Sequence, residues 1–317
     1  MTDTPITSFF KDYFKDFENY DEVLKSDMKI NPNWKKLLTN FSKLGTKELQ
    51  KRQEDLDWLL AENGVTYNVY NDPNGLNRPW SLNIIPFVID NKEWQQLEKG
   101  LQQRAKVLDL VLKDIYGKRE LIKNGIVPSE VIFSHRGFLR PCHQIQYETA
   151  QQLLIHSADL ARGPDGRMWV VNDRTEVPSG MGYALENRFS TREVVPDFFK
   201  EINVKQPFDF FKDLNQLLIN AAVTNTESPT IVILTPGPLN ETYFEHTYLS
   251  SFLGYPLVKG NDLVVRNDKV WIKTFKGLIQ VDVIYRRVDD AYTDPLELKG
   301  DSYLGVAGLL NVVRKQN

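Results

Sequence analysis

The chain contains 317 residues, of which 39 are basic and 42 are acidic, and its formal net charge is -3. Because the two signs are interspersed and form no basic stripe, we exclude a nucleic acid as its main partner. The single cysteine, Cys142, excludes an internal disulfide, and with four histidines the sequence offers no zinc-ligand spacing. No stretch approaches the ~18 apolar residues that cross a bilayer, and the N-terminus lacks the apolar core of a signal peptide. We therefore expect a cytoplasmic protein that does not act at a membrane.

The first part of the chain is predicted to be mainly helical. Two apolar stripes at helical spacing lie within residues 9–60, and Gly64 follows the second at a position typical of a helix C-terminus. The stripes consist of Phe10, Tyr13, Phe14 and Phe17, and of Leu49, Leu56, Leu59 and Leu60. VTYNVY, at 65–70, has the pattern of a strand. A long amphipathic helix is then expected from Asp90, which can form a capping box with Glu93, to Gly117.

From about residue 131 the hydrophobic period changes to that of strands, in EVIF, LLIHSADL and RMWVVND. After the helical segment DFFKDLNQLLINAAV, the strand TIVILTP, the helix ETYFEHTYLSSFLG and the strand PLV predict a right-handed crossover between parallel strands. DLVVRNDKVWIKT is expected to be a hairpin around Asn267 and Asp268, and QVDVIYRR a further strand. The predicted fold is α/β, with a mainly helical region at 1–130, a mixed central sheet at 131–205 and an α/β crossover unit at 206–317.

The segment ADLARGPDGRMWVVNDR predicts a hairpin, because an Asp-Gly pair at 165–166 separates two apolar runs. If this pair forms the turn, Asp159 lies opposite Asn172 and diagonal to Arg174, and Asp173 points to the other face. A three-residue loop would exchange the faces and place Asp173 beside Asp159. The sequence alone leaves both registers open.

Oxygen ligands on neighbouring strands are what a Mg²⁺ ion bound to nucleotide phosphates requires, and Asp159 is the candidate ligand of this hairpin. The alternative is a strand-end salt bridge between Asp159 and Arg174, which the hairpin considered alone favours. The next loop, Pro178-Ser179-Gly180-Met181-Gly182, could present backbone N–H groups to phosphate or could be a plain turn.

Two further clusters lie at predicted strand ends. Arg286 and Arg287 in YRRVDDAYTDP could bind a carboxylate or phosphate through paired hydrogen bonds, whereas salt bridges with Asp289 and Asp290 are the ordinary explanation. TPGPLNETYFEH places a Gly-Pro turn between a strand and a helix, where anions are favoured. His246 in that helix has no neighbouring nucleophile, so we expect a packed histidine and no catalytic base.

Taken together, these segments resemble the circularly permuted ATP-grasp family, type 2, which is related in design to glutathionylspermidine synthase. They are YDEV, NGVTYNVYNDPNGLNRPWSLN, GFLRPCH, ADLARGPDGRMWVVNDRTEVPSGMGYALENR, ILTPGPLNETYFEHTYLSSFLGYPLVKGNDLVVR and VDVIYRRVDDAYTDPLELKGDSYLGVAGLLNVVR. The resemblance implies a partial ATP-grasp fold and an ATP-dependent carboxylate–amine ligase, in which ATP and Mg²⁺ activate a carboxylate as an acyl phosphate. Family members continue with lysine-bearing strands that enclose ATP, so we expect this chain to be truncated before that lid.

The family pattern also assigns roles to individual residues. The predicted metal ligands are Asp159 and Asn172, the predicted phosphate-site residues are Asp173, Arg174, Ser179 and Gly180, and the predicted catalytic residues are Arg188, Arg286 and Arg287. Ligase-like relatives carry Glu and Asn where this chain has Asn172 and Arg174, which motivates the competing hypothesis of a non-catalytic binding module. The expected partners are carboxylate and amine substrates, either small molecules or peptides, and an alpha-E domain protein.

Overall fold

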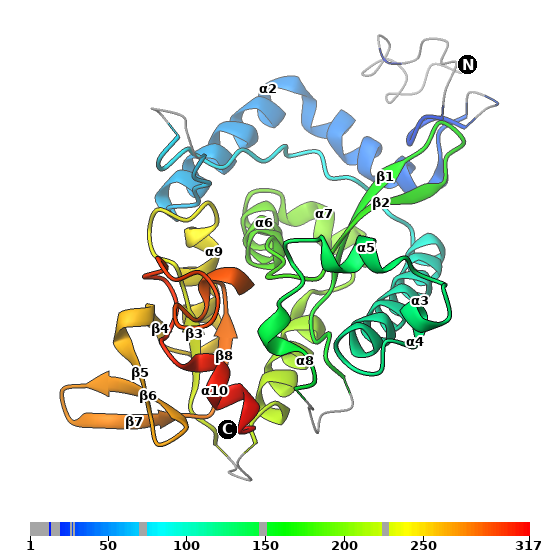
Figure 1. The fold of residues 1–317 in the computed structure, drawn as a ribbon. Helices are drawn as coiled ribbons and strands as arrows, with labels where there is room; N and C mark the ends of the chain where they lie inside the picture. The colour runs from blue at the N-terminus through cyan, green and yellow to red at the C-terminus, as the bar shows by residue number, and fades with distance from the viewer. Residues whose placement is uncertain are drawn as a thin grey trace.

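The computed structural model describes residues 13, 20–25, 27, 29–69, 75–145, 151–223 and 228–317, so most of the first predicted stripe lies outside the described residues. Helices and strands are mixed along the chain, which confirms the α/β prediction (Figure 1). The strands form three separate sheets, with the orders β1-β2, β4-β3-β8 and β5-β6-β7. The expected central mixed sheet is therefore wrong, because within the described residues β1 and β2 form a separate two-stranded sheet. No helix of the described chain has the length and apolarity needed to cross a membrane.

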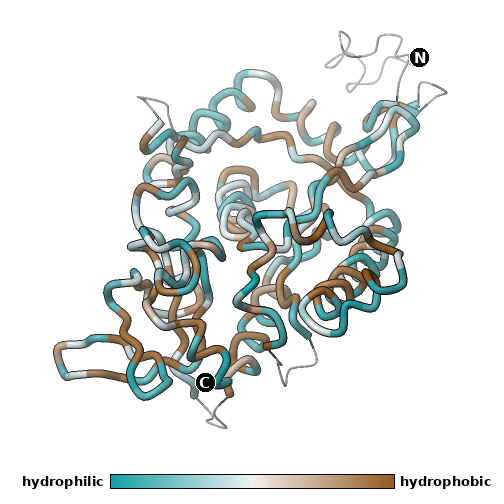
Figure 2. The backbone as a smooth tube through the Cα atoms, in the orientation of Figure 1, coloured by the Kyte–Doolittle hydropathy of each residue, from teal (hydrophilic) through white to brown (hydrophobic). Residues whose placement is uncertain are grey.

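The first long helix, α2 (Pro32–Glu62), begins where the Asn31 side chain caps it and is kinked at Gly45, whose φ is 76°. Gly64 follows its end with a φ of 65°, as predicted. Its inner face packs on α6 (Met181–Val194) and α7 (Pro196–Glu201). The core there includes Leu37, Phe41, Leu56, Leu60, Tyr183 and Phe198. Hydrophilic and hydrophobic residues alternate along α2, as expected of an amphipathic helix (Figure 2).

The second long helix, α3 (Asn91–Tyr116), confirms both predicted ends. The Asp90 carboxylate accepts a hydrogen bond from the Glu93 N–H, and Gly117 is the C-cap. The short helices α4 (Glu120–Lys123), α5 (Ser129–Phe133) and η1 (Arg140–Cys142) follow. EVIF lies in α5, so the strand predicted there is wrong: Pro128 starts a helix that satisfies its own backbone groups.

The strand predicted at 65–70 is also wrong. Within its described residues, 65–69, the structure has only an isolated bridge, from Thr66 to Pro79. Asn68 instead forms hydrogen bonds with the loop that precedes α9, through its backbone N–H to Glu241 and its side chain to Asn240. Hydrogen bonds to this loop therefore take the place of the strand-to-strand hydrogen bonds that the prediction required.

The hairpin combines elements of both predicted registers. β1 (Ser157–Arg162) pairs with β2 (Met168–Arg174), and the Gly163 N–H donates to the Arg167 carbonyl, which leaves a three-residue loop at 164–166. Leu160 lies opposite Val170, but Asp159 lies opposite Asn172. Val171 is therefore the extra residue of a β-bulge, and the bulge restores the pairing that a two-residue turn would have given.

The crossover unit follows α8 (Phe208–Asn220). β3 (Ile231–Leu234) is completely buried, and α9 (Tyr243–Leu253) joins it to β4 (Leu257–Val258), which is parallel to β3 as predicted. β8 (Val283–Arg286) pairs with the other edge of β3 and is also parallel. The sheet β4-β3-β8 therefore ends all three strands on the same side.

An antiparallel sheet extends this unit. It consists of β5 (Leu263–Arg266), β6 (Lys269–Thr274) and β7 (Gly277–Val281), with the short helices η2 (Gly260–Asp262), η3 (Asp290–Tyr292) and α10 (Leu309–Arg314) beside it. Asn267 and Asp268 form the predicted turn, both with positive φ. QVDVIYRR is not one strand: the Asp282 carboxylate accepts the Thr230 N–H at 2.8 Å, and the chain changes sheets at this residue.

Candidate functional site

The carboxyl ends of the parallel sheet β4-β3-β8 form the candidate site. β3 lies at the centre, the chain crosses to β4 on one side, and β8 pairs on the other. In open α/β sheets, ligands bind outside the carboxyl ends of the strands where connections diverge in this way. Thr235, Lys259 and Arg287 directly follow the three strands there.

Arg287 links this edge to the loop before α6. Its guanidinium donates to the Pro178 carbonyl at 2.9 Å, to Ser179 Oγ at 2.7 Å and to Glu245 Oε1 at 2.9 Å. The side chains of Arg287 and Glu245 are 1% and 0% exposed. Because a charge buried without its partner is strongly unfavourable, each side chain holds the other in place.

The second oxygen of Glu245 occupies the N-terminus of α6. Oε2 accepts the Gly180 N–H at 2.6 Å and the Gly182 N–H at 2.9 Å. The first N–H groups of a helix have no partner within the helix, and together with the helix dipole they attract anions. Here the anion is a carboxylate of the chain itself. The sequence left open whether this loop binds phosphate or is a plain turn. In the structure, these two N–H groups bind an anion that belongs to the chain itself.

His246 lies beside this pair and is 1% exposed. Its Nδ1 lies 2.9 Å from Thr235 Oγ1, and its Nε2 lies 3.3 Å from Thr242 Oγ1. Burial, and the nearby charge of Arg287, lower the pKa of His246 to about 3. The imidazole is therefore neutral at physiological pH, which agrees with the prediction of a packed histidine.

The predicted metal ligands face a cation. Asp159 lies 2.9 Å from Arg174, and Asn172 Nδ2 lies 3.4 Å from the same carboxylate. The hydrogen bonds from Arg174 are the main cause of a lowered pKa at Asp159. The salt bridge that the sequence left as the alternative is thus present. Among the described residues there is no group of three His, Cys, Asp or Glu side chains suited to a metal ion.

Asp173 lies on the opposite face of the hairpin. The Arg104 guanidinium of α3 donates to both of its oxygens, at 2.6 to 2.8 Å, and His156 Nε2 lies 2.9 Å from Oδ1. Hydrogen bonds from Arg104, and then from His156, lower the pKa of Asp173 to about 2. Asp173 therefore joins the hairpin to α3. No local pattern in the sequence pointed to Arg104, because it lies 69 positions before Asp173.

The predicted catalytic arginines are not gathered at one point. Arg286 forms an ion pair with Asp290, the ordinary explanation that the sequence offered. Arg188 donates to the Lys205 carbonyl at 3.0 Å and lies over the Phe199 ring, and burial lowers its pKa. A separate hydrogen bond, from the Asp290 N–H to Glu176 at 2.6 Å, connects the loop after the hairpin with the segment that follows β8.

Sequence reasoning missed Lys259. Its side chain passes over Gly237, whose φ of 105° requires glycine, and no acidic partner of its ammonium group occurs among the described residues. Its position immediately after the strand segment PLV was the signal that could have identified it. Lys259 is thus a cation of the carboxyl edge that is available to an anionic ligand.

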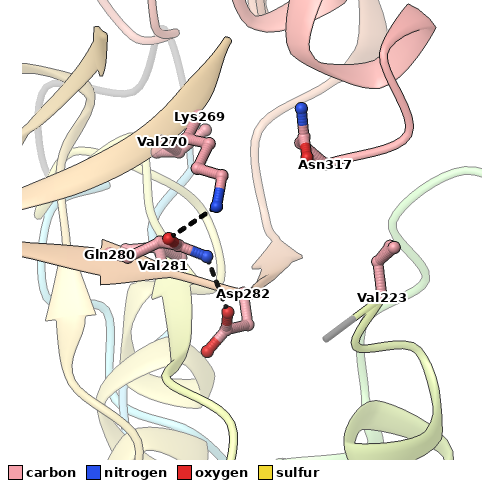
Figure 3. A pocket seen from close by; sticks show the side chains of 7 residues that line it. All are labelled: Val223, Lys269, Val270, Gln280, Val281, Asp282 and Asn317. Carbon is pink, nitrogen blue, oxygen red and sulfur yellow. Dashed lines mark hydrogen bonds between the residues drawn. The ribbon is translucent and has the colours of Figure 1, made fainter. Parts of the chain in front are cut away.

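Two hollows in the described part of the molecule can be compared as ligand sites. One, between β6, β7 and the C-terminus, has a volume of about 30 Å³, room for a single water molecule. Figure 3 shows Lys269, Gln280 and Asp282 in a chain of hydrogen bonds along its wall. The other is an open groove of about 410 Å³ between the end of α2 and α9. Only the groove has the size of a ligand site.

Comparisons with known proteins give one family match and several similar proteins. Residues 86–317 match the family model described as circularly permuted ATP-grasp type 2. The chain is similar to the uncharacterized protein sll0335 of Synechocystis sp., with 40% identity over 297 residues, covering 93% of this chain and 62% of that protein. It is also similar to the uncharacterized protein Rv2567 of Mycobacterium tuberculosis, with 38% identity over 299 residues, covering 92% of this chain and 34% of that protein. The chain thus spans from 34% to 62% of the length of these two relatives.

Proposed function

Because this chain belongs to the circularly permuted ATP-grasp family, type 2, we propose that it is part of an ATP-dependent, ligase-like protein that joins a carboxylate to an amine. The family match is the observation that carries this proposal. Activation of the acid as an acyl phosphate, expected from the sequence, is part of it. The relatives are longer than this chain, so the activity is proposed for the whole protein.

The carboxyl edge of the parallel sheet supports a role in binding the acid. The side chain of Lys259 extends over Gly237 at this edge. A cation with no acidic partner among the described residues is suited to a carboxylate. We assign the substrate acid to this edge, with Lys259 as the residue that pairs with its charge.

The residues predicted to bind Mg²⁺ do not fit the ion as they lie. A magnesium site needs oxygen ligands that carry negative charge, whereas Asp159 is already paired with Arg174 and Asn172 is a neutral amide. Two neighbouring cations would repel each other. We therefore assign no step to a metal at this hairpin.

The predicted phosphate loop likewise does not fit a nucleotide at α6. The N–H groups of Gly180 and Gly182 are bonded to Glu245, and a phosphate placed there would meet this carboxylate. Ser179 Oγ is held by Arg287 at 2.7 Å. The loop joins α6 to the crossover unit, and any contact of this chain with ATP has to use other groups.

A second candidate function is a binding module that keeps the acid site and has no nucleotide chemistry. Two observations favour it: the ion pair between Asp159 and Arg174, and the carboxylate of Glu245 at the helix N-terminus. The two candidates differ in whether the whole protein binds ATP.

Calorimetric titration of this chain and of a longer relative with ATP, with and without Mg²⁺, distinguishes the two candidates. Where this chain binds ATP, the ligase proposal expects Asp159→Asn to leave that binding unchanged, since Asp159 is occupied by Arg174. Asp165→Asn at the hairpin turn is the matched control, because Asp165 pairs with Arg167 in a similarly exposed ion pair. Loss of magnesium-dependent binding in Asp159→Asn alone would restore the metal role.

The longer relative from Synechocystis should be titrated in parallel. If that relative binds ATP and this chain does not, the nucleotide site lies in residues that this chain does not contain. If neither binds ATP, the binding-module candidate is supported and the ligase proposal is wrong.

A further inference from the structure

The groove between α2 and α9 is lined by aromatic rings and neutral polar groups. Its walls are formed by Asn63, Gly64, Thr66, Tyr243, Phe244, Thr247, Tyr248 and Ser251. The α9 residues of this set repeat at intervals of four and share one side of the helix, while Glu245, His246 and Leu249 on the other side are buried. The groove is thus distinct from the carboxyl edge of the sheet, and no residue of its walls carries a formal charge.

A buried carboxylate lies directly behind this wall. Glu186 of α6 is 5% exposed and accepts hydrogen bonds from Asn63 Nδ2 and Ser190 Oγ, both at 2.8 Å. The Tyr248 hydroxyl also bonds to it, and burial followed by the charge of Glu186 raises the pKa of Tyr248. Two of these three donors, Asn63 and Tyr248, are residues of the groove.

All three partners of Glu186 are neutral. The other buried carboxylates among the described residues pair with a cation or accept several backbone N–H groups. Glu245 pairs with Arg287, Asp109 pairs with Lys113, and Asp294 accepts three N–H groups. A buried negative charge without a counter-ion is costly, and a cation in the adjoining groove would reduce that cost.

Two further features favour positive charge at the same place. The C-terminus of α2 faces the groove through Asn63 and Gly64, and its last turn contains no basic residue to offset the negative end of the helix dipole. The aromatic residues Tyr243, Phe244 and Tyr248 line the groove, and the ring centroids of the last two lie 5.5 Å apart. Aromatic faces attract organic ammonium ions through their negative quadrupole.

We propose that this groove binds a small organic ammonium ion, held by the aromatic rings of α9 and balanced by the buried charge of Glu186. Hydroxyl groups of Thr247 and Ser251 at its rim suit a ligand that also carries a hydrogen-bonding group. Binding of an ammonium ion in this groove does not depend on the proposed ligase activity, because it requires neither a nucleotide nor an acid substrate.

Choline and its neutral isostere, in which carbon replaces the quaternary nitrogen, test the charge requirement without any nucleotide. Binding is followed by NMR on the whole chain at millimolar ligand. We expect choline to bind at least about tenfold more tightly than the isostere. Equal affinities, or no binding of choline, would overturn the proposal.

Two variants test the position of the site. Glu186→Gln keeps the shape and hydrogen-bonding atoms of the side chain and should remove most of the preference for choline over the isostere. Ser251→Trp, at an exposed position on the rim, should block the groove without disturbing the core. Ser134→Trp on the exposed C-cap of α5 is its control and should leave binding unchanged. If Glu186→Gln does not fold, unchanged choline binding in Ser251→Trp still overturns the proposal.

Discussion

The guanidinium of Arg287 and the carboxylate of Glu245 lie 2.9 Å apart with almost no exposed surface, and together they hold the loop before α6 against the parallel sheet. Arg287 reaches the loop through Pro178 and Ser179, and Glu245 reaches it through two backbone N–H groups. The pair therefore fixes the position of α6, whose Glu186 lies behind the groove. One buried contact connects the proposed acid site with the proposed cation site.

Glu245→Ala should be strongly destabilising, because it leaves the charge of Arg287 buried without a partner. We expect the free energy of unfolding to fall by about 3–5 kcal/mol, measured by urea denaturation. Asp159→Ala, which removes an exposed ion pair with Arg174, is the control and should lower the free energy of unfolding far less, because exposed ion pairs contribute little to stability. Similar losses in both variants would show that the buried pair does not have the weight that we assign to it.

His246 should make stability depend on pH. Its folded pKa of about 3 lies below its ordinary value of 6.5, so the unfolded chain binds a proton that the folded protein does not. Above pH 6.5 His246 is neutral in both states and does not lower the stability. As the pH falls below 6.5, this histidine lowers the free energy of unfolding by about 1.4 kcal/mol per pH unit.

His246→Gln removes this titration while offering hydrogen bonds to the same threonines. Urea denaturation between about pH 7 and about pH 5 should therefore show a steeper loss in the parent chain than in the variant. Parallel curves for the two proteins would mean that His246 becomes protonated in the folded state.

Asp173 should make the stability of the protein depend on pH in a lower range than His246 does. Hydrogen bonds from Arg104 and His156 hold its folded pKa at about 2, against an ordinary value of 3.8. Its contribution to stability is therefore present above pH 3.8 and is lost as the pH falls through about 2. In Arg104→Gln, NMR titration of the Asp173 carboxyl group should give a pKa closer to the ordinary value. No change on removal of Arg104 would assign the shift to His156.

The sequence predicted elements better than it predicted how they pair. Capping groups and glycines are local signals, and they located the ends of α3 and the turn at Asn267 correctly. The bulge at Val171 could not be read from the sequence, because its apolar run has no feature that distinguishes a paired residue from an extra one. The strand predicted at EVIF was wrong because a short run of three apolar residues, Val131 to Phe133, suits either a helix or a strand.

The sequence identified charged residues of the site, but it did not show which residues they pair with. The sequence identified Asp159, Arg174, Arg286 and Arg287 as charged groups at strand ends, and all four are in ion pairs. Glu245, which pairs with Arg287, was overlooked because the two are 42 positions apart and belong to different elements. Pairings at such separation depend on the packing of α9 against α6 and β8, for which a single sequence contains no local signal.

Two glycine substitutions within helices should have opposite effects. A Cβ atom on Gly182, in the first turn of α6, would lie 2.9 Å from Glu245 Cγ, in a buried region where neither backbone nor side chain has room to move. Gly182→Ala should therefore destabilise the protein by about 1–3 kcal/mol, through strain in the contact between Glu245 and the helix N-terminus. Gly100→Ala in α3 is the matched control, because a Cβ atom there has no neighbour within 4 Å. That variant should gain about 0.5–1 kcal/mol, since alanine loses less backbone entropy than glycine in a helix. Urea denaturation of both variants measures the two effects, and a gain in stability for Gly182→Ala would show that Glu245 is not held closely against the start of α6.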